Sequence, residues 1–88
     1  MRDLAELRRE IDEIDGELVG LLKRRLAVVD EIAAAKRASG TPVGDSGRED
    51  AILARVAAQA GAEYADDARQ LFAAMFSIAR ARQRRAMA

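Results

Sequence analysis

Charged side chains gather within a single bend of the sequence, between Ile32 and Glu49. They include Lys36, Asp45, Arg48 and Glu49. Two cations that face two carboxylates across a short loop can bind a small anion that also carries a hydroxyl group. Charged residues at a turn between helices are more often solvated. The prediction of a binding site therefore depends on the sequence that flanks the bend.

Arg25 occupies a position where the preceding apolar pattern calls for Leu or Ile, one turn after Leu21. A guanidinium group on a core-facing stripe is costly unless an anion pairs with it. Lys36 follows about three helical turns later, so it projects from the same face of a helix as Arg25. We therefore expect both cations to bind one anion.

Arg8 and Gln83 complete the candidate residues. Arg8 precedes Arg25 by about 25 Å along a common helix, so it can reach a ligand at Arg25 only from an antiparallel partner helix. Gln83 ends an apolar series that begins at Phe72, and its neutral amide can donate a hydrogen bond without adding charge. The ordinary alternatives are a solvated Arg8 and a helix that becomes polar near its end.

Three helices are expected to position these residues. Apolar residues at alternating steps of three and four predict one helix from about residue 3 to about residue 37. We call this series the heptad seam, which consists of Leu4, Leu7, Ile11, Ile14, Leu18, Leu21, Val28 and Ile32. A second helix is predicted from Asp45 or Ser46 to Gly61, and a third from an N-cap at Asp66 to about Arg85.

The length of the first helix predicts that one chain cannot bury it. At about 1.5 Å per residue the helix is roughly 50 Å long, whereas a compact chain of this length has a radius of gyration of roughly 12 Å. A second subunit is therefore expected. The apolar faces of the shorter helices are Ile52, Leu53, Val56, Ala57 and Ala60, and Leu71, Phe72, Met75, Phe76 and Ala79.

Composition argues against several classes of function. Fifteen acidic and fifteen basic side chains cancel, so no net field draws nucleic acid or an anionic membrane. The chain has neither Cys nor His, so the usual metal-ligand clusters and the Ser-His or Cys-His nucleophiles are not available. The N-terminus is charged from its second residue and resembles neither a signal peptide nor a membrane span. We expect a cytoplasmic protein.

Sequence motifs span nearly the whole chain. They are L-x-x-L-R-x-x-I-x-x-I-D from Leu4 to Asp15, L-x-x-R from Leu22 to Arg25, A-x-x-K-x-x-x-G-x-P-V-x-D-x-x-R-E from Ala33 to Glu49, and Gln83. Together they resemble the all-helical chorismate mutase family. The resemblance implies an all-α fold with one domain, residues 1–88, whose three helices form an intertwined homodimer. It also implies chorismate as the substrate and no cofactor or metal.

The resemblance further implies the substrate-binding residues, which are Arg8, Arg25, Lys36, Asp45, Arg48, Glu49 and Gln83. Lys36 and Gln83 would flank the ether oxygen and, with Arg25, form the catalytic group. The reaction is an intramolecular Claisen rearrangement of chorismate to prephenate, which requires no nucleophile, base or cofactor. Bidentate arginines suit the two carboxylates, and preorganised donors suit the negative charge that develops on the ether oxygen.

The remaining roles also follow from the resemblance. Arg8 would reach the site from the partner subunit, while Glu49 and the backbone near Asp45 would hold the substrate hydroxyl. Some family members carry a small hydroxyl residue one turn before the glutamine, where this chain has Ala79. The loss of that carboxylate contact suggests weaker substrate binding.

Other functions stay open at this point. The same scaffold could act as an isochorismate pyruvate-lyase or a 4-amino-4-deoxychorismate mutase, because those substrates carry nearly the same carboxylates and ether oxygen. Glu49 as a hydroxyl acceptor favours chorismate. A non-catalytic helical dimerisation module is the alternative from another class. That reading accounts for the heptad seam but leaves Arg25 and Gln83 on apolar faces unexplained.

Overall fold

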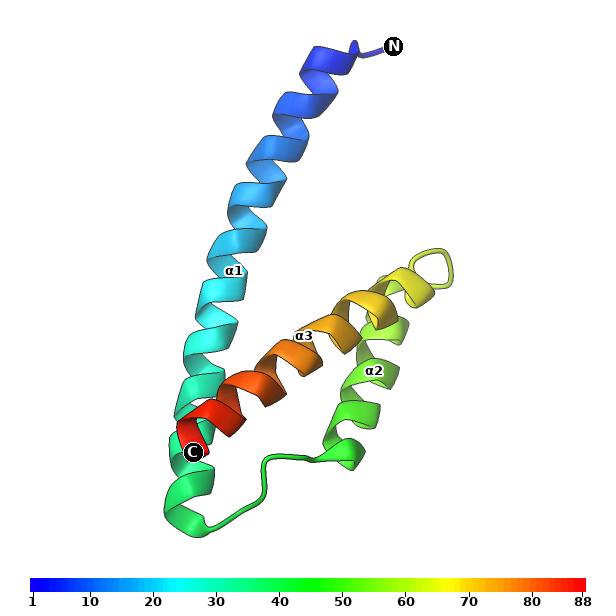
Figure 1. Cartoon of the computed structure of the whole chain (residues 1–88). Helices are drawn as coiled ribbons and strands as arrows, with labels where there is room; N and C mark the ends of the chain where they lie inside the picture. The colour runs from blue at the N-terminus through cyan, green and yellow to red at the C-terminus, as the bar shows by residue number, and fades with distance from the viewer.

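The chain folds into α-helices alone. The computed structural model describes residues 1–88, and its helices are α1 (Leu4–Ser39), α2 (Ser46–Ala60) and α3 (Ala65–Met87) (Figure 1). The predicted all-α class and the order of one long and two shorter helices are confirmed. None of these helices combines the length and the apolar character that a membrane crossing requires.

Local capping explains where α1 and α2 begin and where α1 ends. The Asp3 carboxylate accepts a hydrogen bond from the Glu6 N–H at 2.8 Å, and the Asp45 carboxylate accepts one from the Arg48 N–H at 3.0 Å. Such carboxylates satisfy free N–H groups and suit the helix dipole. Gly40 ends α1 with φ 71°, a conformation that is least costly for a residue without Cβ. The bend between α1 and α2 is thus fixed at both ends.

The start of α3 differs from the prediction. The helix begins at Ala65, with Tyr64 at the N-cap position and no side-chain capping bond. Asp66 lies inside the first turn, where its carboxylate pairs with Arg69 at 2.8 Å. A negative charge in the first turn is still favourable beside the helix dipole. The assignment of Asp66 as the N-cap was therefore wrong, although its carboxylate stabilises the first turn of α3.

Helix α3 is the element that joins the fold. It packs against both α1 and α2, whereas α1 and α2 do not pack on each other. Figure 1 shows α3 returning from the α2–α3 turn to the C-terminal half of α1. The buried cluster between α2 and α3 consists of Ile52, Val56 and Phe76, with Leu53, Ala68 and Phe72 packed against it.

The predicted core faces are confirmed in most positions, and Leu71 is the exception. Ala57 and Ala79 are buried beside the α2–α3 cluster, but Leu71 is 55% exposed. Leu71 directly precedes Phe72 and so lies about 100° around the helix from it. The stripe that continues from Phe72 faces the core, and Leu71 falls outside it.

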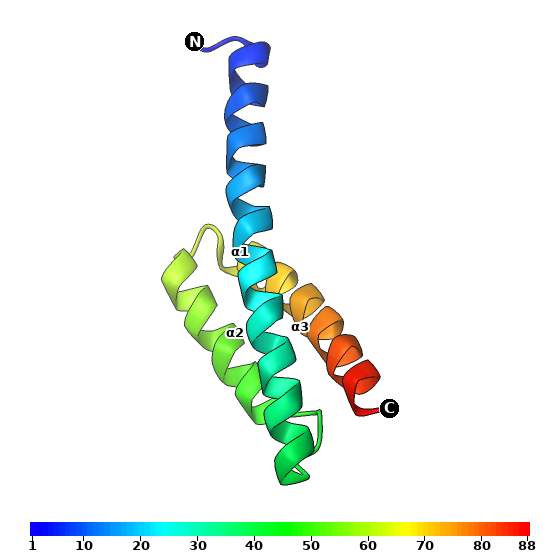
Figure 2. The ribbon, with the colours of Figure 1, turned by 90° about the vertical axis from the view of Figure 1, so that its left-hand side faces the viewer.

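The heptad seam is uncovered in this chain. Every member is between 42% and 59% exposed, and the only buried residues of α1 are Val29 and Ala33. The N-terminal half of α1 extends beyond the other two helices in both views (Figures 1 and 2). The radius of gyration is 16.3 Å, compared with roughly 12 Å for a compact chain of this length. The prediction that one chain cannot bury this helix is confirmed.

An ion pair between Asp30 and Arg82 connects α1 to α3. The Arg82 guanidinium donates from Nε to Asp30 Oδ1 at 3.1 Å and from Nη2 to Oδ2 at 2.6 Å. These hydrogen bonds lower the pKa of the Asp30 carboxyl, and the same carboxylate raises the pKa of Arg82. Arg37 of α1 adds a hydrogen bond from Nη1 to the carbonyl of Ala86, one turn after Arg82, at 3.3 Å. The C-terminal ends of α1 and α3 are therefore held together by polar contacts.

We expect Asp30→Asn to lower the free energy of unfolding slightly near neutral pH, since a half-exposed ion pair is screened by solvent. The folded-state pKa of Asp30 lies below its unfolded value, so the pair stabilises the fold above the unfolded pKa. This stabilisation is lost as the pH falls through the folded-state pKa. Urea denaturation from about pH 7 to about pH 2 tests this, because the difference between the two proteins should vanish at the acid end. A difference that persists there would instead identify a packing effect.

Candidate functional site

A cleft of about 820 Å³ lies between the three helices and the loop that joins α1 to α2. Because α1 and α2 do not pack on each other, α3 forms the wall that connects them. The cleft brings together six of the predicted site residues, which are Arg25, Lys36, Asp45, Arg48, Glu49 and Gln83. Arg8 does not line it and is exposed on the free half of α1. One chain therefore supplies all of the predicted site except Arg8.

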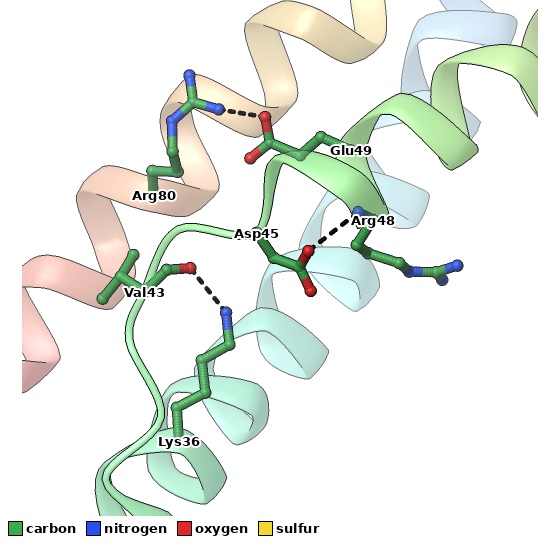
Figure 3. A network of polar contacts seen from close by, with 6 residues as sticks. All are labelled: Lys36, Val43, Asp45, Arg48, Glu49 and Arg80. Atoms are coloured by element: carbon green, nitrogen blue, oxygen red, sulfur yellow. Dashed lines mark hydrogen bonds and ion pairs between the residues drawn. The ribbon is translucent and has the colours of Figure 1, made fainter.

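Lys36 and Gln83 are in direct contact across the cleft wall. The Lys36 ammonium donates to Gln83 Oε1 at 2.9 Å and to the Val43 carbonyl at 2.8 Å (Figure 3 shows the latter bond). Gln83 is the one buried polar residue of the chain. An ammonium group can pair only with the oxygen of an amide, so the Gln83 amide nitrogen keeps its two N–H donors. A free N–H of Lys36 and the Gln83 amide thus form a pair of adjacent donors.

Asp45 and Arg48 have different environments although they are close in sequence. The Asp45 carboxylate is the N-cap of α2, and its backbone carbonyl accepts from the Glu49 N–H at 3.1 Å. The Arg48 guanidinium extends away from that carboxylate (Figure 3) and makes no hydrogen bond within the chain. The guanidinium group of Arg48 therefore lines the cleft with its N–H donors available to a ligand.

Arg25 contacts aromatic rings instead of a carboxylate. Its guanidinium carbon lies 5.8 Å from the Phe72 ring centroid and 5.9 Å from that of Phe76. The two rings pack edge to face, with centroids 6.3 Å apart. The faces of aromatic rings attract cations, so the rings offset part of the cost of half-burying Arg25. The expectation that only an anion could offset this cost was incomplete, and the hydrogen-bond donors of Arg25 stay free for a ligand.

Arg80 is a cleft residue that the sequence reasoning missed. It lies on α3 and donates from Nη1 to Glu49 Oε1 at 2.5 Å (Figure 3). The two side chains are only 33% and 25% exposed. A signal was present, since Arg80 follows Phe76 by one turn and precedes Gln83 by almost one turn, which places it on the same helix face. Arg80 was nevertheless given no role on the basis of the sequence.

The cleft carries a surplus of positive charge within a chain whose net charge is zero. Its lining cations are Arg24, Arg25, Lys36, Arg48, Arg55 and Arg80, and its lining carboxylates are Asp45 and Glu49. The chain contains no group of three or more acidic, His or Cys side chains that could hold a metal ion. A concave site with this charge attracts anions by electrostatic steering. The arrangement suits a small anion with more than one carboxylate.

Comparisons with known proteins provide independent support. A family model described as chorismate mutase type II matches residues 7–84. A chorismate mutase of Methanocaldococcus jannaschii is 38% identical over 53 residues, which cover 60% of this chain and 54% of that protein. The chain thus spans about half the length of the curated relative that it matches. No solved structure matches significantly. Because the family model covers most of its residues, the chain belongs to the chorismate mutase type II family.

Proposed function

We propose that this protein catalyses the rearrangement of chorismate to prephenate. The observation that carries the proposal is the hydrogen bond of 2.9 Å between Lys36 and Gln83. It places an ammonium donor and an amide donor side by side at the wall of a cationic cleft. Membership of the chorismate mutase type II family and the chorismate mutase relative support the same reaction.

Binding of the substrate is assigned to the unused cations of the cleft. Chorismate carries two carboxylates, and a guanidinium group can bind a carboxylate through two parallel hydrogen bonds. Arg25 and Arg48 have donors that nothing within the chain occupies. By binding both carboxylates, they would hold the flexible substrate in its compact, reactive diaxial conformation. Such positioning is a large part of catalysis for an intramolecular reaction.

Acceleration of the bond rearrangement is assigned to Lys36 and Gln83. Negative charge develops on the ether oxygen as its C–O bond breaks, and fixed donors stabilise such charge more strongly in a cleft than in water. Glu49 would accept the hydrogen bond of the substrate hydroxyl through its free oxygen, since only Oε1 is used by Arg80. The cap of Asp45 holds the first turn of α2, including Glu49, beside the loop.

We also infer that two chains form an intertwined homodimer in which Arg8 completes the site of the other subunit. The support is the heptad seam, a long apolar face that lies in water in the single chain. Burial of one Leu or Ile side chain contributes roughly 1.5–3 kcal/mol. Arg8 follows Leu4 by one turn and so shares the side of the helix that the partner would cover. An antiparallel partner would carry Arg8 toward the cleft that lacks it.

The direct test is incubation of the purified protein with chorismate and, in parallel, with isochorismate and 4-amino-4-deoxychorismate. We expect prephenate from chorismate as the main activity. Salicylate and pyruvate from isochorismate as the main products would replace the proposal with the lyase. Preferred turnover of the amino analogue would replace it with the amino mutase. A folded protein that turns over none of them would favour the non-catalytic dimerisation module.

Mixing two inactive variants tests the shared site. Arg8→Ala and Lys36→Ala each damage every site of their own homodimer. In a mixed dimer, one site combines the intact Lys36 of one chain with the intact Arg8 of the other. Random co-refolding of equal amounts should therefore restore about one quarter of wild-type activity, since half of the dimers are mixed and each has one intact site. Each variant refolded alone is the control, and a mixture no more active than these controls would place Arg8 within its own chain.

A further inference from the structure

We propose that Arg80 is a positioning residue that orients Glu49 for the substrate hydroxyl, an inference that rests on the proposed function. The contact is one nitrogen to one oxygen, Arg80 Nη1 to Glu49 Oε1, at 2.5 Å. Glu49 Oε2 makes no hydrogen bond within the chain. Arg80 thus immobilises the carboxylate through one oxygen and leaves the other to accept from a ligand.

Glu49 has no other side-chain partner that could fix its orientation. A glutamate has three rotatable side-chain bonds, and ordering them costs conformational entropy. The Asp45 cap fixes the backbone of Glu49 but not its carboxylate. Arg80 crosses from α3 to supply that constraint (Figure 3). Without it the hydroxyl acceptor would sample several rotamers, and the substrate would have to order it on binding.

One turn of α3 connects α1 and α2 through three side-chain contacts. Arg80 contacts Glu49 on α2, Arg82 contacts Asp30 on α1, and Gln83 contacts Lys36 on α1. The first and third of these contacts reach the proposed hydroxyl acceptor and the proposed ether-oxygen donor. Residues 80–83 therefore set the distance between the proposed acceptor for the substrate hydroxyl and the proposed donors to its ether oxygen.

Arg80 also offsets the charge of Glu49. A bare carboxylate in the cleft would repel a dicarboxylate substrate, and such repulsion is stronger in a partly buried site than in water. With Arg80 in place, the pair is neutral and the other cations of the cleft remain available. Orientation and charge both act on the bound substrate before the reaction, so their loss should raise KM more than it lowers kcat.

A double-mutant cycle separates this role from a structural one. We expect Arg80→Met to raise KM roughly tenfold and to change kcat by less than about threefold. In a Glu49→Gln background the same substitution should change KM by less than about twofold, because the carboxylate is already absent. Arg80→Lys should recover most of the wild-type KM, since the contact needs only one N–H. Arg84→Met, on the exposed side of α3, is the matched control and should leave both constants unchanged.

The outcomes are distinct. An equal rise in KM in both backgrounds would overturn the inference and place Arg80 in direct contact with the substrate or in the fold alone. So would a KM that Arg80→Lys does not recover. If Arg80→Met does not fold, Arg80→Leu takes its place in the cycle with the same expectations. A wild-type protein that does not turn over chorismate would overturn the proposed function and this inference with it, whereas an active wild type with additive effects overturns only the role of Arg80.

Discussion

Replacing Lys36 by Ala should lower kcat by about 10²- to 10³-fold, equivalent to about 2.7–4 kcal/mol of transition-state stabilisation. The ammonium group is held by the Val43 carbonyl and Gln83 Oε1, so its remaining donor is fixed before the substrate binds. A donor that is already oriented acts on the developing charge without reorganisation. Steady-state kinetics with chorismate measures the effect, and the loss should fall mainly on kcat.

The matched control is Lys23→Ala. Lys23 is the other lysine of the chain, exposed on α1 and outside the cleft, and its loss should leave kcat unchanged. Lys36 also holds the loop through Val43, so a second variant must separate the loop from the chemistry. Gln83→Leu keeps the Lys36–Val43 contact and should still lower kcat. Full activity in Gln83→Leu would show that the Gln83 amide is not one of the donors to the ether oxygen.

Arg25→Leu should abolish most of the activity while the fold persists. Removing one partner of a desolvated, hydrogen-bonded charge pair costs about 2–5 kcal/mol, which is roughly a 30- to 5,000-fold fall in kcat/KM. The free energy of unfolding should change by no more than about 1 kcal/mol. Leu continues the heptad seam, but it loses an attraction to Phe72 and Phe76 of about 0.5–1 kcal/mol.

Urea denaturation and chorismate kinetics on the same sample test both parts. Arg25→Lys is the matched variant, because it keeps the charge but loses the planar fork that binds a carboxylate through two bonds. We expect it to be more active than Arg25→Leu and less active than the wild type. If Arg25→Leu unfolds, Arg25 is a structural residue. If it folds and keeps wild-type kinetics, Arg25 does not bind the substrate.

The helices and their approximate limits could be predicted because the information is local. Apolar spacing, the carboxylates of Asp3 and Asp45, and the glycine at position 40 act over one or two turns. The bend was also recognisable as a cluster of charges, and its residues do line one cleft. Interruptions of an apolar stripe were informative too, since Arg25 and Gln83 face the cleft and not the solvent.

What could not be predicted depends on contacts between helices. The partner of Glu49 is Arg80, which is far away in sequence and lies in a run of arginines that resembles a solvated tail. The rings beneath Arg25 come from α3, so the offset of its burial could not be read from α1. The start of α3 is a local exception, since the helix begins at Ala65 and Asp66 lies in its first turn. For Glu49 and for Arg25, the deciding neighbour is supplied by the tertiary fold.

If a second chain covers the heptad seam as proposed, catalytic activity depends on protein concentration. In the proposed dimer, folding, assembly and completion of the active site are one equilibrium, so each depends on how often two chains meet. A tenfold dilution removes about 1.4 kcal/mol from the free energy that holds such a pair together. Specific activity would then fall on dilution in the test tube, and a cell that halves its supply of this chain would lose more than half of its catalytic capacity once the concentration approaches the dissociation constant.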